Sequence, residues 1–404
     1  MAKLKIPKRE NRLTVLFFQI CVIANNLFGS DAQLYIISKI LTLAFFCVVL
    51  LRILQKGKVQ LNQILLVPLL VTAYCAATAF WAHDPDLVIS QMVTQVQLLI
   101  LLLFTFWAMN DGVTVLDYLK AVYVSGLGLA LLAVLRYGGV ERYTDAMLSG
   151  ERMGGDIANQ NTFGIVFGNA ALSTAYYFVV QKKRIHLLPF AVFVVFAFSS
   201  GSRKAMLMII AGIIVIAVLH YGIRQIYRTL IVSAVVLVGA IILLQTPVFG
   251  VLAQRLTTML RGEETASDRA RQSMIEFGLE LFRQRPIHGF GLDNFRALYI
   301  GRTYSHNNYI ELLSSGGIIA LVLYYLMFLL PTGGLLLSRK KKEKLPAMHV
   351  MLLVWLAVEL FFGVALVQFH LKNSWILAGM LMAEGAKASA RKRMRLEDKH
   401  EADR

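Results

Sequence analysis

The chain has 404 residues, of which 57% are hydrophobic and only 16% are charged. This composition lies far from that of soluble globular proteins, so it excludes an ordinary soluble domain and indicates an integral membrane protein. The formal net charge of +17 indicates membrane topology and an attraction to anionic membrane lipids, and no nucleic-acid binding is expected.

Apolar runs long enough to cross a bilayer, about 17 to 25 residues, recur along the whole chain. They predict an all-α integral membrane protein with about twelve transmembrane helices. The seventh and the last runs are short, which leaves about ten or eleven spans open. In chain order the predicted spans are 13–29, 34–54, 61–81, 91–109, 116–136, 160–180, 186–200, 204–222, 227–246, 316–337, 347–369 and 374–388.

Basic segments mark every second connection, from "MAKLKIPKRENR" at the start to "RKRMR" near the end. Because lysine and arginine are retained on the cytoplasmic side, both termini are predicted to be cytoplasmic. The connection 110–117 has no basic residue and is assigned to the inside by alternation alone. The connections predicted to face outward are 25–33, 82–90, 137–159, 199–203, 247–305 and 370–373.

These patterns predict one polytopic membrane domain over residues 1–404, with no internal repeat. The first apolar run is not followed by a convincing cleavage site, so we expect it to stay as a membrane anchor. The charged residues 389–404 are predicted to form a cytoplasmic tail. The long interruption of the membrane pattern is the outer loop 247–305, and function is therefore sought there.

The outer loop contains eight arginines, six acidic residues and no lysine. A planar guanidinium that is always protonated suits bidentate binding of phosphate or carboxylate, so the loop is predicted to hold an anion. The alternative is that the acidic residues pair with these arginines on a solvated surface. The arginines are Arg255, Arg261, Arg269, Arg271, Arg283, Arg285, Arg296 and Arg302.

Arg269 has the most distinctive setting in this loop. The stretch "SDRARQSMIEFGLELFRQRP" predicts an amphipathic helix with Ser267 as N-cap and Pro286 after its end. Ala270, Met274, Phe277 and Leu281 are predicted to share its apolar face. An arginine in the first turn lies against the positive end of the helix dipole, which is unfavourable unless an anion binds there. The arginine and the helix N-terminus are therefore predicted to form a compact phosphate site. A local pair between Arg269 and Asp268 or Glu264 is the alternative.

Two further outer segments carry candidate binding residues. Arg203 follows the small-residue turn in "SSGSRKA", close to hydrocarbon, where a charge is a functional candidate unless it snorkels to water. The segment 149–164, "SGERMGGDIANQNTFG", offers Arg152, Asn159 and Asn161. Asparagine amides can bind sugar hydroxyls. Capping of the next helix by Asn159 is the alternative reading.

His306 lies in "YSHNNYIELL", just before an apolar run. With Ser305 as N-cap, His306 falls in the first turn, where the helix dipole and nearby arginines are expected to lower its pKa. A neutral imidazole there can act as a general base. The alternative is a capping or interfacial histidine. His288 in "PIHGFG" competes for the role, although its Gly-x-Gly turn indicates architecture.

Four motifs in order, "SSGSRKA", "SDRARQSM", "RPIHGFGLDNF" and "YSHNNYIELLSSGGIIALVLY", resemble the O-antigen ligase and polymerase superfamily of polytopic glycosyltransferases. The resemblance implies a GT-C-like membrane fold and transfer of a glycan from undecaprenyl diphosphate, outside the bacterial cytoplasmic membrane. By this similarity Arg203 and Arg269 bind the diphosphate and His306 deprotonates the acceptor hydroxyl. No metal and no cofactor are implied.

The resemblance leaves the acceptor open, because the family includes ligases to lipid A core, polymerases of glycan repeat units and protein O-glycosylating enzymes. The motif "SHNNYIELLSSGG" is more similar to capsule or exopolysaccharide polymerases than to the other branches of the family. Besides the glycan donor and acceptor, membrane lipids are the expected partners. The further candidates for substrate binding are Arg152, Asn159, Asn161, Arg271, His288, Asn307 and Asn308, and for the last two helix-entry capping is an alternative.

A different class of function also fits twelve spans, namely a transporter or flippase of the same lipid-linked sugar. Ionisable residues in mid-membrane are typical of transporters. Glu359 in "WLAVELFFG" is the main such residue, and a hydrogen bond between helices explains it as well as a proton relay does. A non-catalytic membrane scaffold, the third possibility, would tolerate replacement of His306 and the outer arginines.

Overall fold

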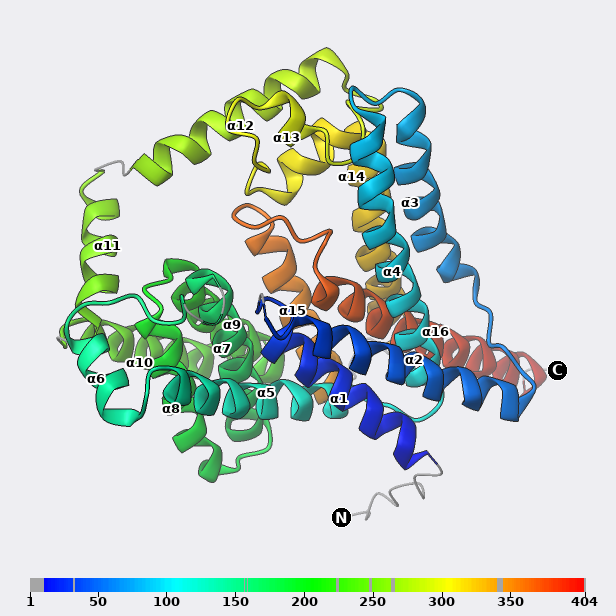
Figure 1. Cartoon of the computed structure of the whole chain (residues 1–404). Helices are drawn as coiled ribbons and strands as arrows, with labels where there is room; N and C mark the ends of the chain where they lie inside the picture. The colour runs from blue at the N-terminus through cyan, green and yellow to red at the C-terminus, as the bar shows by residue number, and fades with distance from the viewer. Residues whose placement is uncertain are drawn as a thin grey trace. The chain divides into compact units, whose positions relative to one another are not determined.

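The computed structural model describes residues 11–31, 33–155, 157, 159–222, 225–246, 249–262, 266–339 and 344–402. Within these ranges the regular elements are all helical, which confirms the all-α prediction (Figure 1). Eight of the described helical segments are long and apolar enough to cross a membrane. They are Tyr35–Lys56, Gln63–Phe80, Pro85–Asn110, Val115–Arg136, Gln160–Val180, Arg203–Tyr221, Ile226–Leu244 and Asn308–Leu337, and Arg12–Phe28, Arg184–Ser199 and Ala347–Phe362 are shorter apolar helices.

The predicted spans correspond closely to these helices, with differences at the ends. The eleventh span, 347–369, ends early because its helix stops at Phe362. The twelfth belongs to a longer helix, Lys372–Ala402, which also includes most of the predicted charged tail. The tenth starts early, at Asn308, because the helix expected after Ser305 joins it across a kink at Gly317.

The chain divides into two compact units, each described here by itself. Unit 1 contains residues 1–56, 111–263 and 345–354. Its helices are α1 (Arg12–Phe28), α2 (Tyr35–Lys56), α5 (Val115–Arg136), α6 (Val140–Leu148), α7 (Gln160–Ala175), η3 (Tyr176–Val180), η4 (Arg184–His186), α8 (Leu187–Ser199), α9 (Arg203–Tyr221), α10 (Ile226–Leu244) and α11 (Gly250–Leu260).

Unit 2 contains residues 57–110, 264–344 and 355–404. The helix α15 (Ala347–Phe362) begins in unit 1 and ends in unit 2. The other helices of unit 2 are η1 (Gln63–Leu65), α3 (Leu66–Ala77), η2 (Thr78–Phe80), α4 (Pro85–Asn110), α12 (Ala266–Gln284), α13 (Phe295–Leu298), α14 (Asn308–Leu337) and α16 (Lys372–Ala402).

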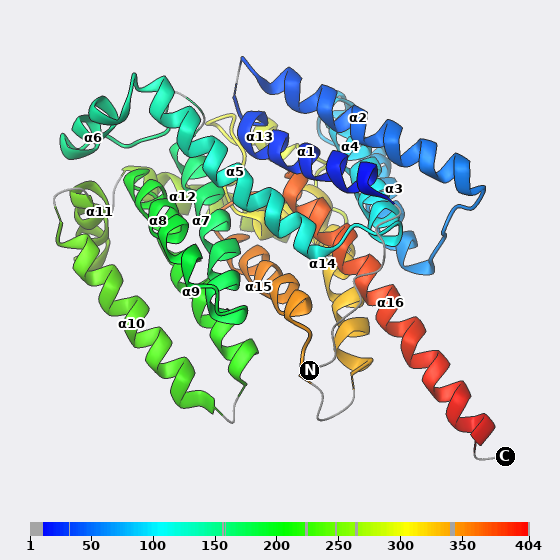
Figure 2. The ribbon, with the colours of Figure 1, turned by 90° about the horizontal axis from the view of Figure 1, so that it is seen from below.

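Unit 1 is built around α7, which packs against α5, α8 and α9 (Figure 2). Small residues allow these helices to approach closely, as is usual in membranes. A Cβ at Gly168 would lie 2.1 Å from Met208 Cε, and one at Gly212 would lie 2.4 Å from Leu172 Cδ2. The sequence of α7 therefore sets the spacing of the helix that carries Arg203.

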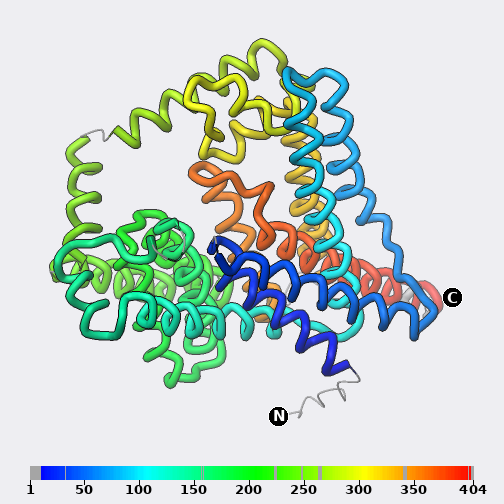
Figure 3. Tube along the Cα trace, in the orientation of Figure 1, coloured from blue at the N-terminus to red at the C-terminus, as the bar shows by residue number. Residues whose placement is uncertain are grey.

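Unit 2 is built around α14, which packs against α3, α12 and α16 (Figure 3). Gly317 kinks α14 with a φ of 64°. A side chain there would meet the backbone of Ile287, so the glycine lets the segment before α13 lie directly on the kink. Glu359 is buried and accepts a hydrogen bond from the Tyr324 hydroxyl at 3.1 Å. This contact agrees with the reading of Glu359 as an interhelical hydrogen-bond partner.

Within unit 1, connections that were assigned to the same side of the membrane lie together. Asp111, in the connection without basic residues, forms ion pairs with Lys56 and Arg52. Arg136 pairs with Asp31 at 3.2 Å, and both lie at connections that are predicted to face outward. The connection 110–117 therefore lies beside a basic segment, as the alternation requires. The membrane side on which each group lies stays a prediction.

Candidate active site

Arg203 is the first residue of α9 and follows a tight turn that ends α8. Gly201 adopts a φ of 62°, a left-handed conformation that glycine tolerates. Ser202 caps α9 by accepting a hydrogen bond from the Ala205 amide at 3.4 Å. The glycine and the serine thus place the half-buried Arg203 at a helix N-terminus, which is a favourable place for an anion.

Two other arginines hold the same turn in unit 1. Arg152 Nε donates to the carbonyl oxygen of Ser200 at 3.1 Å, and Arg255 Nη1 donates to the carbonyl oxygen of Gly201 at 2.9 Å. Three positive side chains from separate elements therefore gather around residues 200–203. No local pattern distinguishes Arg255 from the other seven loop arginines, because 54 residues separate it from its partner.

The two asparagines of the segment 149–164 have different roles. Asn159 caps α7, and its side chain accepts from the Asn161 amide at 2.9 Å. This confirms the capping alternative for Asn159. Asn161 Oδ1 lies 3.5 Å from Arg152 Nη2, so Asn161 belongs to the arginine-rich turn.

Arg269 is the fourth residue of α12, in its first turn as predicted, and is exposed. The prediction of Ser267 as N-cap was wrong, because Ala266, a strong helix former, already belongs to the helix. Asp268 is one of the two acidic residues considered as partners of Arg269. Its carboxylate lies 3.9 Å from Arg271 Nη1. The other acid, Glu264, lies outside the described residues.

An apolar cluster fixes α12 against the start of α14. Met274 and Leu281 are buried and pack with Phe290, Phe295 and Ile310, while Phe277 is partly buried against them. These three residues of α12 confirm the predicted apolar face. Ala270 is exposed, so its inclusion in that face was wrong, because the cluster contacts only the later turns of the helix.

His306 lies before α14 and outside its first turn. The prediction that Ser305 caps this helix was wrong, since Asn307 is the N-cap and accepts from the Tyr309 and Ile310 amides at 3.0 and 3.2 Å. His306 itself has a φ of 55°. Its half-buried ring lies against Tyr304, with ring centroids 4.2 Å apart.

Ser305 does not cap α14 because its amide and its hydroxyl form other hydrogen bonds. Its amide donates to Glu311 Oε2 at 2.7 Å, and its hydroxyl donates to the carbonyl oxygen of Asn307 at 2.8 Å. Glu311 is buried, and its Oε1 atom has no hydrogen-bond partner among the described residues. A buried carboxyl group therefore fixes the backbone next to His306 by a hydrogen bond.

Asn308 has an architectural role. It is fully buried, and its Oδ1 accepts from the amides of Gln368 and Phe369 at 2.8 and 3.0 Å. Its Nδ2 donates to the Tyr325 hydroxyl at 3.0 Å. The protein itself thus uses this amide, and the asparagine ties the segment before α16 to the backbone that follows His306.

His370, which we did not single out in the sequence, lies in this tied segment. Its Nδ1 atom is 2.8 Å from Gln91 Nε2 and 3.1 Å from Gln95 Nε2. Two amide donors require that Nδ1 be an acceptor, so the proton of the neutral ring is on Nε2. Burial, helped by the Arg296 charge, lowers the pKa of His370 to about 3. Arg296 in turn pairs with Asp293 at 2.5 Å.

The contacts of His288 support the architectural reading of its turn. Its ring meets Trp81 edge-on at 5.6 Å, and Trp81 Nε1 donates to its carbonyl oxygen at 3.1 Å. In the same Gly-x-Gly turn, the amides of Phe290 and Gly291 donate to the carbonyl oxygens of Ser314 and Ser315 at 2.9 and 2.8 Å. The turn therefore fastens the loop to α14.

The candidate residues fall into two groups, one in each unit. Unit 1 brings Arg203 together with Arg152, Asn161 and Arg255, and unit 2 contains Arg269, Arg271, His288 and the segment 306–308. Arg203 and Arg269 lie in the first turns of α9 and α12, and His306 lies two residues before the first residue of α14.

Comparison with known families places these residues in context. A family model described as O-antigen ligase matches residues 188–325. The matched segment includes Arg203, Arg269 and His306, whereas Arg152 precedes it. Among curated proteins, none matches the chain. The family match supports the resemblance found in the sequence: residues 188–325 match the O-antigen ligase family, the family that the four ordered motifs resemble.

Proposed function

We propose that the chain is a glycosyltransferase that moves a glycan from undecaprenyl diphosphate to an acceptor hydroxyl at the outer face of the bacterial cytoplasmic membrane. In this proposal both termini of the chain lie in the cytoplasm. The observation that carries the proposal is that the matched segment contains Arg203 and Arg269 in the first turns of α9 and α12, and His306 two residues before α14. Helix N-termini and guanidinium groups both attract a diphosphate.

In the proposed reaction, His306 accepts the proton of the acceptor hydroxyl as the oxygen attacks the anomeric carbon of the donor glycan. The bond between that carbon and the diphosphate oxygen breaks, and undecaprenyl diphosphate leaves with the bonding electrons. Arg203 and Arg269 stabilise the charge that develops on the diphosphate. His306 then releases its proton to solvent. The reaction balances with no redox partner and no metal.

The architecture of each group supports these roles. Around Arg203, backbone carbonyl groups hold Arg152 and Arg255, so the turn concentrates positive charge without lysine. Before α14, Asn307 caps the helix and Glu311 holds the Ser305 amide. Side chains fixed in this way lose little entropy when substrate binds, which favours a preorganised site.

The direct test is transfer by purified protein in detergent, with an undecaprenyl diphosphate oligosaccharide as donor and no added metal. Lipid A core and a second repeat unit are supplied as separate acceptors, because product from one or the other distinguishes a ligase from a polymerase. We expect transfer that a chelator does not reduce. Movement of the donor between leaflets without any product would contradict the proposal and support a flippase.

By the proposed mechanism, Arg203 and Arg269 contact the diphosphate of the same donor. Arg203→Ala and Arg269→Ala should each lower the transfer rate by about a hundred-fold or more. The double variant should lose less than the product of the two single losses, since both remove contacts to one diphosphate. Fully multiplicative losses would separate the two residues into independent sites. Arg283→Ala, an exposed arginine at the other end of α12, is the matched control.

A further inference from the structure

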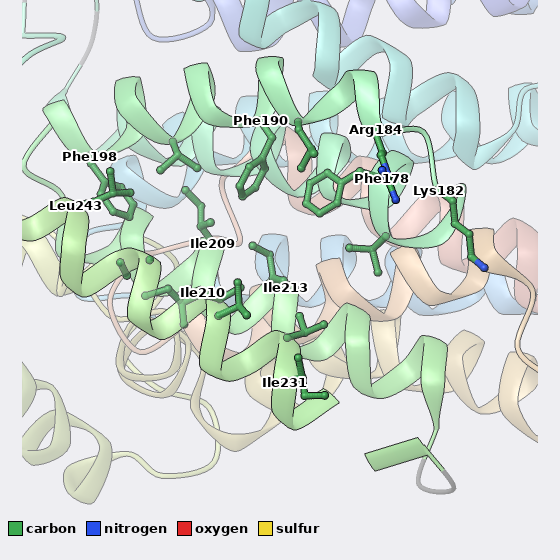
Figure 4. Close-up of a pocket in the computed structure, with 18 of the residues that line it drawn as sticks. Phe178, Lys182, Arg184, Phe190, Phe198, Ile209, Ile210, Ile213, Ile231 and Leu243 are labelled. Atoms are coloured by element: carbon green, nitrogen blue, oxygen red, sulfur yellow. The ribbon is translucent and has the colours of Figure 1, made fainter. Parts of the chain in front are cut away.

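Unit 1 contains an elongated apolar groove between α8, α9 and α10, with a volume of about 610 Å³. Its walls include Phe190 and Val194 of α8, Ile213 of α9, and Ile231 and Val235 of α10. Figure 4 shows these helices converging on the groove, with aliphatic and aromatic side chains directed into it. A groove with such walls suits a hydrocarbon chain.

The packing of α10 keeps the groove open. Helix α10 packs mainly against α9, and only 11% of its most apolar 18-residue stretch is buried. Gly239 and Ala240 line the groove from α10, and a Cβ at Gly239 would meet no atom within 4 Å. Because α9 and α10 are long and apolar enough to span a membrane, lipid chains surround such helices and can enter.

Positive charge gathers at one end of the groove. Lys182 and Arg184 line that end, and Phe198 and Leu243 line the other (Figure 4). Arg228 lies nearby, since its guanidinium is 5.8 Å from the ring of Tyr221, another lining residue. An apolar channel with cations at a single end matches a ligand that has a hydrocarbon chain and an anionic head.

We propose that the groove binds an acyl chain of an anionic phospholipid, whose phosphate lies at Lys182 and Arg184. By the predicted topology this end faces the cytoplasm, where an anionic lipid surface attracts basic residues. The chain would cover the exposed apolar side of α10 and stabilise its position on α9, the helix that begins with Arg203.

The glycan donor fits this groove less well than a phospholipid does. Its diphosphate is proposed to lie at Arg203, the first residue of α9, whereas Lys182 and Arg184 lie near Tyr221, the last residue of α9. Helix α9 has 19 residues, so its two ends are about 28 Å apart at about 1.5 Å per residue. A donor chain in the groove would leave the cations without a phosphate.

The test reconstitutes the full chain in nanodiscs of equal parts phosphatidylglycerol and phosphatidylcholine and measures the lipids that remain bound by native mass spectrometry. We expect phosphatidylglycerol to be retained in preference to phosphatidylcholine. Lys182→Gln and Arg184→Gln should each reduce this preference about five-fold. Gly239→Phe should fill the groove and abolish retention of the chain.

Matched controls separate the groove from general effects of charge and size. Lys183→Gln removes a neighbouring charge that does not line the groove, and Gly333→Phe adds a ring to α14 where a Cβ meets no atom within 4 Å. Both should retain phosphatidylglycerol as the unaltered chain does, and thermal unfolding in detergent verifies that each variant folds. Equal retention of both lipids, or full retention in Gly239→Phe, would overturn the proposal. So would loss of bound undecaprenyl diphosphate, but not of phosphatidylglycerol, in Gly239→Phe.

Discussion

Arg255 donates a hydrogen bond from Nη1 to the carbonyl oxygen of Gly201 at 2.9 Å, two residues before Arg203. The contact brings a cation from the predicted outer loop to the turn that begins α9. A second guanidinium thereby lies close to Arg203, the residue that is proposed to bind the diphosphate. Positive charge at this turn depends on the tertiary fold of unit 1 and not on neighbouring sequence alone.

Arg255→Ala is expected to lower kcat/KM for the glycan donor by about ten-fold, because it removes a charged hydrogen bond at the proposed diphosphate site. Initial rates over a range of donor concentrations measure this loss. Arg261→Ala, an exposed residue that ends α11, serves as the control and should change the value little. An Arg255→Ala enzyme as active as the control would exclude Arg255 from the donor site.

Gly278→Ala should destabilise the protein, although a glycine-to-alanine change inside a helix usually stabilises by about 0.4–1 kcal/mol. The added Cβ would lie 2.2 Å from Ile310 Cγ2 and force α12 away from α14. Thermal unfolding in detergent provides the measurement. Gly333→Ala, where a Cβ meets open space, should be neutral or stabilising.

The same steric account predicts the behaviour of a double variant. Ile310→Ala removes the methyl group in conflict, so Gly278→Ala combined with Ile310→Ala should cost less stability than the sum of the single changes. Strict additivity would mean that the two residues do not clash, and the close packing of α12 on α14 would then be wrong.

His370→Gln should make the protein less sensitive to acid. The pKa of His370 is about 3 in the folded chain, against an ordinary value of 6.5. Below pH 6.5 the unfolded chain gains a proton that the folded chain does not, so stability present above that pH is lost as the pH falls towards 3. At about pH 5 the loss amounts to about 2 kcal/mol.

Glutamine retains an acceptor for Gln91 and Gln95 but does not titrate. The difference in unfolding temperature between neutral pH and about pH 5 should therefore be smaller in His370→Gln than in the unaltered chain. Equal differences in the two proteins would show that His370 is not held in its neutral form. Because Arg296 keeps its charge throughout this range, it does not add to the effect.

Much of the fold could be predicted because the signals for membrane helices are local. Each apolar run corresponds to a helix, and Asn159 caps α7 as its position suggests. The helix entries at Ser267 and Ser305 were misassigned, because several neighbouring residues can cap a helix. Tertiary contacts decide among them, as when Glu311 takes the Ser305 amide and Asn307 becomes the cap.

The parts of the candidate site that the sequence did not predict depend on distant contacts. His370 meets Gln91 across 279 residues, and Arg255 meets Gly201 across 54. Neither pair has a local pattern that distinguishes it from other polar residues on the same connections. Motif order, in contrast, singled out Arg203, Arg269 and His306, and the family match covers all three.

The central claim, that His306 removes the acceptor proton, is tested most directly by the rate of a single turnover with saturating donor and acceptor. His306→Ala should slow this chemical step by about a hundred- to ten-thousand-fold while donor binding stays within a few-fold of the unaltered protein. His220→Gln, at the far end of α9, should not slow it. If His306→Ala transfers glycan as fast as the unaltered protein, His306 is not the general base and the proposed mechanism is wrong.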